Sequence, residues 1–161
     1  MKCNDEFKTF LPDGLDGMYV HIPKRIIELL SKYKQQPSMN ESGGMLFAGI
    51  NNNSLYILAA TEPSHEDKSH RFGIAMNKKK MQDKINEMYY KHNLHYVGDW
   101  HTHPEEKPTP SYQDLSTAKG FLNNQKSLNY FVMIIVSCTS FDDSYLGLCG
   151  KSREHRLNVQ K

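Results

Sequence analysis

Two histidines separated by one residue, His101 and His103, form the part of this sequence best suited to bind a metal ion. They follow an apolar run, residues 94–100, that predicts a β-strand. Because successive side chains of a strand point to opposite faces, both imidazoles would project from one face, about 7 Å apart along the strand, and could reach the same ion. Asp114, expected in the first turn of the next helix, would add an oxygen ligand. Two imidazoles, a carboxylate and a water molecule make the four-coordinate pattern of catalytic zinc.

The segment around Asp114 also has a purely structural interpretation. Ser111 and Asp114 have the spacing of a capping box, in which the serine caps a helix and the carboxylate binds back to the serine amide. Pro108 and Pro110 suit a chain that is turning into a helix. A His-x-His pair alone has little specificity, so this interpretation stands unless a further residue joins the pattern.

That further residue is Glu41, which precedes Gly43 and Gly44 at the start of an apolar strand predicted for residues 41–50. Taken alone, this glutamate would be a rim residue beside a turn. A carboxylate that lies beside a metal site without being a ligand can act as a general base. Coupled to the His-x-His segment, Glu41 is therefore predicted to be the catalytic base.

The combined pattern resembles the JAMM motif of the JAB/MPN metalloprotease family. It consists of Glu41 before Gly-Gly and an apolar strand, then His-x-His-Pro-x6-Ser-x2-Asp. The resemblance spans roughly residues 18–150, and the stretch 98–104 is most similar to small bacterial members found beside ubiquitin-like conjugation machinery. The glycine that closes the Glu41 strand, Gly49, comes one residue later than the family pattern expects, which concerns only the end of that strand.

The resemblance implies a zinc-dependent isopeptidase or protease that cleaves after the C-terminal glycine of a ubiquitin-like modifier. One zinc ion per chain would be held by His101, His103 and Asp114 and would lower the pKa of its water toward about 7. Glu41 would take the proton from this water and later deliver it to the departing amine. Ser111 would donate a hydrogen bond to the oxyanion of the tetrahedral intermediate. Zinc is favoured because imidazole and carboxylate ligands in a tetrahedral site suit it.

A polar segment without periodicity, residues 61–73, predicts a loop, and loops on a rigid scaffold often bind substrate. In the resembled family the loop at this place helps to hold the extended C-terminal tail of the modifier. By that resemblance Arg71 and Phe72 would contact the tail. The alternative is a solvated surface loop with no part in binding.

The composition is that of an ordinary globular protein, with 38% hydrophobic and 24% charged residues in a chain of 161. A formal net charge of +2 is too small to indicate a nucleic-acid partner. No apolar run approaches the ~20 residues of a membrane span, and the first ten residues lack the apolar core of a signal peptide. The three cysteines have no metal-type spacing and are expected to be free thiols, which predicts a cytoplasmic protein.

Strands and helices are expected to alternate, which predicts an α/β fold: a three-layer sandwich with a mixed central sheet between helices. This is also the MPN fold that the resemblance implies, related in architecture to cytidine deaminases. Residues 1–17 are interpreted as a leader, 18–150 as the catalytic domain and 151–161 as a basic tail. Helices are predicted near residues 23–37, 77–92 and 111–122, and the strongest strand at 128–137.

Two other functions compete with the isopeptidase. One is a RadC-like protein of the same fold with a DNA-linked role, which the small net charge and the sequence Trp-His-Thr-His at 100–103 disfavour. The other is a non-catalytic MPN interaction module, which typically lacks a metal ligand, whereas every motif position is present here. The expected partners are a ubiquitin-like protein or its conjugate and E1/E2-like conjugation proteins, with neither nucleic acid nor membrane. Bacterial relatives of this shape also serve antiphage defence.

Overall fold

The structure, a computed structural model, describes residues 5–64, 68–70, 73–75 and 77–161. In these residues, eight strands close into a barrel in the order β1-β10-β9-β8-β7-β3-β4-β2. The barrel strands are β1 (Phe7–Pro12), β2 (Tyr19–Pro23), β3 (Gly43–Asn51), β4 (Ser54–Ala60), β7 (His95–Thr102), β8 (Phe131–Val136), β9 (Tyr145–Cys149) and β10 (Glu154–Val159). Two short strands, β5 (Lys68–His70) and β6 (Gly73–Ala75), form a separate antiparallel pair. The helices are α1 (Lys24–Ser31), α2 (Lys78–His92), α3 (Tyr112–Asn123) and the 3-10 turn η1 (Phe141–Asp143).

The predicted three-layer sandwich is wrong, because the sheet is a closed mixed barrel with its helices outside. The pairs β2–β4 and β7–β8 are parallel, and the other neighbours are antiparallel. Closure depends on β1, which pairs with β10 at Phe10↔Val159 and with β2 at Thr9↔His21. The segments interpreted as leader and tail supply β1 and β10. Their pairing removes the two exposed edges that an open sheet would have.

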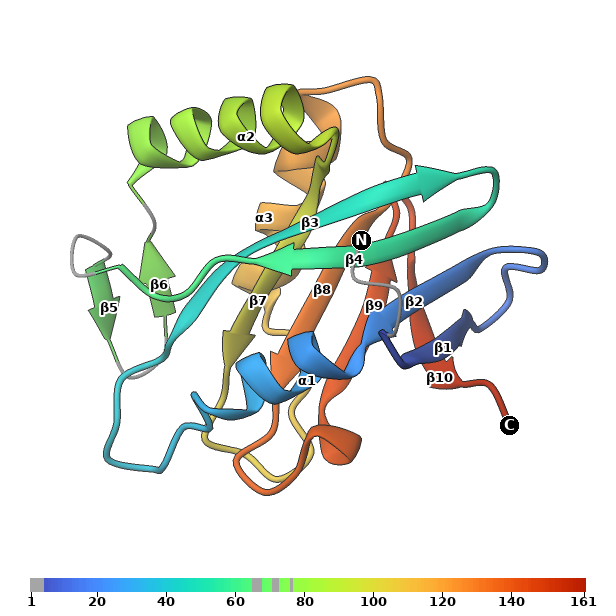
Figure 1. Ribbon diagram of the computed structural model, residues 1–161. Helices are drawn as coiled ribbons and strands as arrows, with labels where there is room; N and C mark the ends of the chain where they lie inside the picture. The colour runs from blue at the N-terminus through green and yellow to red at the C-terminus, as the bar shows by residue number, and fades with distance from the viewer. Residues whose placement is uncertain (1–4, 65–67, 71–72, 76) are drawn as a thin grey trace.

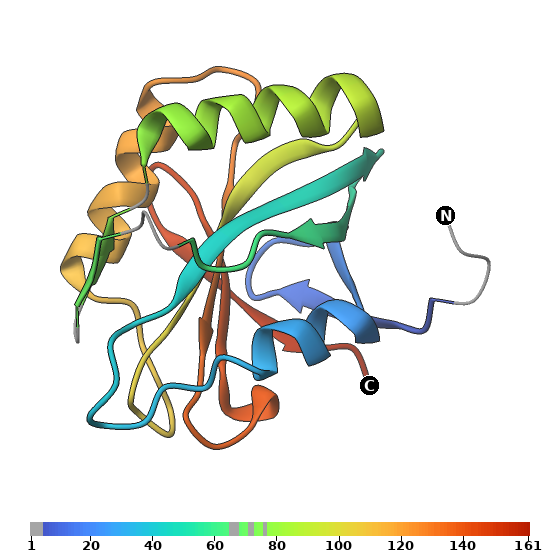
Figure 2. The same cartoon turned by 60° about the vertical axis from the view of Figure 1, so that its left-hand side comes forward.

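The three helices divide into two groups around the barrel. Figures 1 and 2 show α2 and α3 together against one side, over β3, β7 and β8, and α1 at another side. Helix α1 packs Ile26 and Leu30 onto the core that fills the barrel. Helices α2 and α3 cover a second apolar surface on the outside of the sheet, to which Phe47 and Met133 contribute. The candidate site lies on this outer side.

The strand that carries the histidines, β7, lies between β3 and β8. A Cβ atom at Gly98 would overlap the backbone of Val132, so this position accepts only glycine where the parallel strands β7 and β8 meet. The antiparallel register of β3 with β7 pairs Gly43 with His101, which brings the start of β3 next to the His-x-His segment. The long-range pairing of these strands therefore joins the two halves of the sequence motif.

The polar segment 61–73 contains more regular structure than the predicted loop, since β5 and β6 pair through Ser69↔Ile74. Arg71 and Phe72, the predicted tail contacts, lie outside the described residues. None of the helices in the described part of the chain is long and apolar enough to cross a membrane.

Candidate metal centre and active site

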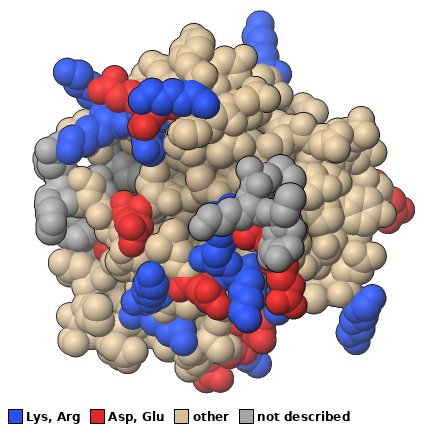
Figure 3. Space-filling model, viewed as in Figure 1, with Lys and Arg blue, Asp and Glu red and all other residues tan. Residues whose placement is uncertain are grey.

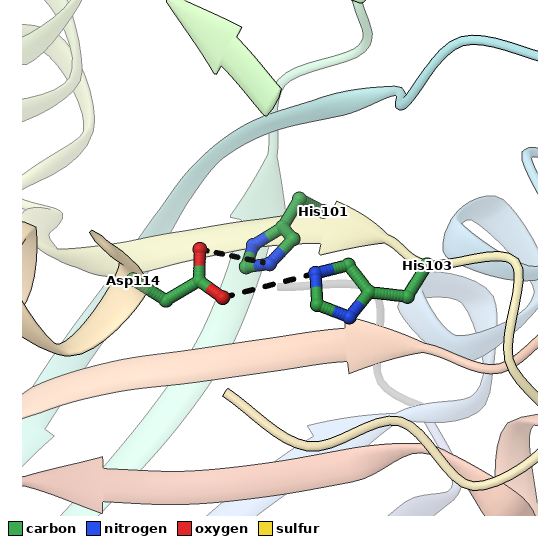
Figure 4. A group of neighbouring side chains, drawn as sticks. All are labelled: His101, His103 and Asp114. Atoms are coloured by element: carbon green, nitrogen blue, oxygen red, sulfur yellow. Dashed lines mark ion pairs between the residues drawn. The ribbon is translucent and has the colours of Figure 1, made fainter. Parts of the chain in front are cut away.

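Three side chains converge on one point at the end of β7. His101 belongs to β7, His103 follows its last residue, and Asp114 lies in the first turn of α3. One ligand atom from each of the three lies within 4.8 Å of the others. Nε2 of His101 is 3.3 Å from Asp114 Oδ1, and Nε2 of His103 is 3.7 Å from Asp114 Oδ2 (Figure 4). The predicted ligands are thus brought together.

The donor atoms of this group fit a metal ion. Among the described residues, one buried side-chain nitrogen or oxygen lacks a hydrogen-bond partner, and it is Nε2 of His101. This atom remains without a partner although it lies 3.3 Å from Asp114 Oδ1. A buried polar atom without a partner is costly and calls for an explanation such as an ion. Two imidazole nitrogens and a carboxylate oxygen are the ligand types of a catalytic zinc site.

Glu41 lies against this group without being one of its three members. Its Oε1 is 3.7 Å from His103 Nε2, and the residue is only 5% exposed. Burial raises the pKa of Glu41 to about 7; His101 acts against this increase, while the carboxylates of Asp114 and Glu105 add to it. A carboxyl group with a pKa near 7 can both accept and return a proton at neutral pH.

A hydrogen-bond network around the buried side chains of Gln35 and Thr102 holds the segment that carries Glu41. Ser42 and Thr102 exchange two bonds of 2.9 Å: the Ser42 amide donates to Thr102 Oγ1, and the Thr102 amide donates to the Ser42 carbonyl. Thr102 Oγ1 donates to Gln35 Oε1 (3.1 Å), and Gln35 Nε2 donates to the Met39 carbonyl (2.7 Å). Sequence reasoning missed Gln35 and Thr102. The alternation of β7 indicates that Thr102 faces inward, whereas no local pattern identifies Gln35.

The N-terminus of α3 shows that Asp114 has two sets of contacts. The capping box is present, because the Ser111 amide donates to Asp114 Oδ2 (2.7 Å) and the Asp114 amide donates to Ser111 Oγ (3.1 Å). The same carboxylate faces His101 and His103. Burial acts to raise the pKa of Asp114, but His101 and Ser111 outweigh it and hold this pKa below its usual range. The structural and metal-binding interpretations of Asp114 are therefore compatible.

Glu105, which sequence reasoning also missed, orients one of the histidines. Its Oε2 lies 3.1 Å from His103 Nδ1, which leaves Nε2 directed toward Asp114. Because such outer contacts fix the orientation of a histidine ligand, Glu105→Gln is expected to weaken zinc binding about 10–100-fold. Competition with a chelator of known affinity measures this change. The neighbouring exposed Glu106→Gln is the matched control, and equal zinc affinity in the two variants would show that Glu105 has no such role.

The site opens into a cleft of about 860 Å³ between α2 and α3. Glu41, Ser111 and the three metal-ligand candidates line one part of it. The part farther along β7 contains Asp99, which accepts a 2.8 Å hydrogen bond from Tyr96. Burial raises the pKa of Asp99 to about 7, although Tyr96 and His101 both act to lower it. The site therefore has room for a substrate segment as well as for the reacting groups.

Comparison with known proteins agrees with this geometry. The family model described as prokaryotic homologs of the JAB domain matches residues 23–146, and the chain belongs to this family. The resemblance found in the sequence is thereby confirmed.

The relatives that bear the name CD-NTase/cGAS isopeptidase include proteins from Escherichia coli and Vibrio cholerae. The protein from Escherichia coli is 32% identical over 108 residues, which cover 65% of this chain and 69% of the relative. The protein from Vibrio cholerae is 31% identical over 104 residues, which cover 63% and 67% of the two chains. The fold is similar to the solution structure of protein DSY2949 from Desulfitobacterium hafniense, with a TM-score of 0.59 at 18% identity, over 87% of this chain and 88% of that one.

Proposed function

We propose that this protein is a zinc-dependent isopeptidase that hydrolyses the amide bond between the C-terminus of a ubiquitin-like protein and a lysine side chain. The observation that carries the proposal is the convergence of the His101–His103–Asp114 group and buried Glu41 on one cleft. The isopeptidase name of the relatives supports the same reaction. Hydrolysis breaks the C–N bond, adds the oxygen of water to the acyl carbon and returns a proton to the amine.

Each residue of the site has a task in this reaction. His101, His103 and Asp114 hold zinc, which when bound supplies a Lewis acid that brings the pKa of a water molecule toward about 7. Glu41 accepts the proton of the attacking water and returns it to the leaving nitrogen, a role that fits its raised pKa. Ser111 Oγ accepts a hydrogen bond from the Asp114 amide. The O–H of Ser111 therefore remains available to donate a hydrogen bond to the substrate oxyanion.

The names of the relatives suggest which conjugates to test. Both names contain the word isopeptidase together with CD-NTase/cGAS. Conjugates of a CD-NTase/cGAS protein are therefore the first substrates to examine, together with conjugates of ubiquitin-like modifiers. We place the enzyme in the cytoplasm beside E1/E2-like conjugation proteins, with a role in antiphage defence. The substrate-binding roles predicted for Arg71 and Phe72 remain part of this proposal.

The test is cleavage of a purified conjugate with a single isopeptide bond, followed by gel electrophoresis and mass spectrometry. The expected result is release of both intact proteins by the zinc-loaded wild type, its loss with a chelator, and its recovery when zinc is restored. A zinc-loaded protein that releases neither protein from any conjugate would contradict the proposal. Tight, salt-sensitive DNA binding would instead favour the RadC-like alternative.

Replacement of Ser111 by alanine tests the oxyanion contact. Loss of one such donor lowers kcat by about 10²–10³, with little change in KM, because the bond strengthens in the transition state. The variant also loses an N-cap, which costs about 1 kcal/mol of stability, so kinetics are measured well below its unfolding temperature. Ser116→Ala, an exposed position on the same helix, is the control. An unchanged kcat in Ser111→Ala would remove this residue from the mechanism.

A further inference from the structure

A carboxylate that the proposed reaction does not use, Asp99, lies in the cleft beside apolar side chains of the sheet. Its neighbours across the register are Met45 on β3 and Met133 on β8. The cleft walls that α2, α3 and β8 contribute hold the polar residues Lys78, Gln82, Thr117 and Asn124 and a larger apolar set: Met81, Ile85, Phe121, Phe131 and Met133. Burial of a carboxylate among such groups is costly unless it has a partner, which makes Asp99 a candidate for ligand binding.

An irregularity in β7 places Asp99 in this cleft together with Tyr96. Side chains three residues apart in a regular strand point to opposite faces. Here the register of β3 with β7 shifts between Leu46 and Phe47, so Val97 has no partner on β3 and forms a bulge. The bulge brings Tyr96 and Asp99 to the same face, where the tyrosine hydroxyl donates to Asp99 Oδ1. Bulges are common beside active sites, where they redirect side chains.

The contacts of Asp99 leave it able to bind a cation. Tyr96 is its hydrogen-bond partner among the described residues and occupies one of its two oxygens. A carboxylate accepts several hydrogen bonds, so the second oxygen remains for a ligand. Lys78 also lines the cleft, but it is an exposed residue at the start of α2, where basic side chains gather on the surface (Figure 3), and its charge is screened by solvent.

We propose that this part of the cleft is a subsite for a lysine or arginine side chain of the substrate, with Asp99 binding its charge. Such a side chain has an aliphatic stem that can lie along the methionine, isoleucine and phenylalanine walls, and a cationic head for the carboxylate. Asp99 precedes His101 by two residues, about 7 Å along the strand. The basic residue therefore belongs to the few residues beside the scissile bond. The inference rests on the proposed function only in taking the ligand to be part of a substrate.

Peptide binding tests the subsite without requiring hydrolysis. The probes are a pentapeptide capped at both ends, with arginine at its centre and alanine and glycine elsewhere, and the same peptide with citrulline, which has the same shape but no charge. Both are titrated into the zinc-loaded wild type at pH 8 and followed by NMR. The arginine peptide is expected to bind at least about tenfold more tightly, since charged hydrogen bonds are the stronger ones.

Two variants separate the effect of the Asp99 charge from that of its hydrogen bond with Tyr96. Asp99→Asn keeps an oxygen that can accept from Tyr96 but removes the charge, and it is expected to bind the two peptides equally. Tyr96→Phe removes the hydroxyl and keeps the charge, and it is expected to retain the preference. The proposed subsite would be overturned if Asp99→Asn still bound the arginine peptide more tightly than the citrulline peptide. It would also be overturned if the wild type bound the two peptides equally. A preference for arginine in a protein that cleaves no conjugate would leave the subsite intact and contradict only the proposed function.

Discussion

Replacement of Glu41 by glutamine is expected to lower kcat by about 10²–10⁴ while zinc content stays at the wild-type level. Glutamine has nearly the same shape but cannot accept the proton of water, and Glu41 is not one of the three ligand candidates. Single-turnover cleavage and elemental analysis on the same preparation measure both quantities. Glu28→Gln, on the exposed face of α1, is the control. Wild-type kcat in the Glu41 variant would exclude this residue as the base.

The same substitution is expected to stabilise the metal-free protein at high pH. Burial raises the pKa of Glu41 from 4.5 to about 7 in the folded state, so the folded protein binds this proton more tightly than the unfolded chain does. The stability that the protonated form contributes is fully present below pH 4.5 and is lost as pH rises through about 7. Glutamine stays neutral, so at pH 8 the variant gains about 3 kcal/mol in free energy of unfolding over the wild type.

Urea unfolding of chelator-treated wild type and Glu41→Gln at pH 4 and pH 8 measures this effect. The free energies of unfolding of the two proteins should differ little at pH 4 and clearly at pH 8. A constant difference between the two pH values would mean that Glu41 is not held in a desolvated environment. The active site would then lack the cost in stability that buried catalytic carboxylates usually carry.

The second large effect is expected from His103→Ala, which should abolish both zinc binding and hydrolysis. Zinc content should fall from about one ion per chain toward zero, because only one imidazole and one carboxylate would remain. Asp114→Ala should also lose zinc, together with its capping bond to Ser111. The exposed His92→Ala, at the end of α2, should retain both zinc and activity.

Elemental analysis of these proteins side by side also decides between the enzyme and the alternative of an inert module. If the wild type takes up no zinc after reconstitution, the capping box is the sole role of Asp114. The chain would then be a non-catalytic MPN interaction module. Zinc in the wild type and in His92→Ala, but not in His103→Ala, would establish the three-ligand centre.

The sequence by itself determined the local parts of this protein. The spacing of His101 and His103 predicted that both imidazoles point to the same side of the chain, and Ser111 with Asp114 predicted the capped start of α3. The apolar run at 128–137 predicted a central strand, which the structure contains as β8. These predictions succeed because side-chain alternation and helix capping depend only on residues that are near in sequence.

The tertiary structure decided how distant segments combine. Closure of the barrel depends on β1 and β10, two segments from opposite ends of the chain whose pairing no local pattern announces. Thr102 is linked to Gln35 across 67 positions, and Asp99 enters the cleft only because β7 carries a bulge opposite β3. Strand pairing and register follow from the packing of the whole core, so the positions of these side chains become known only when the chain is folded.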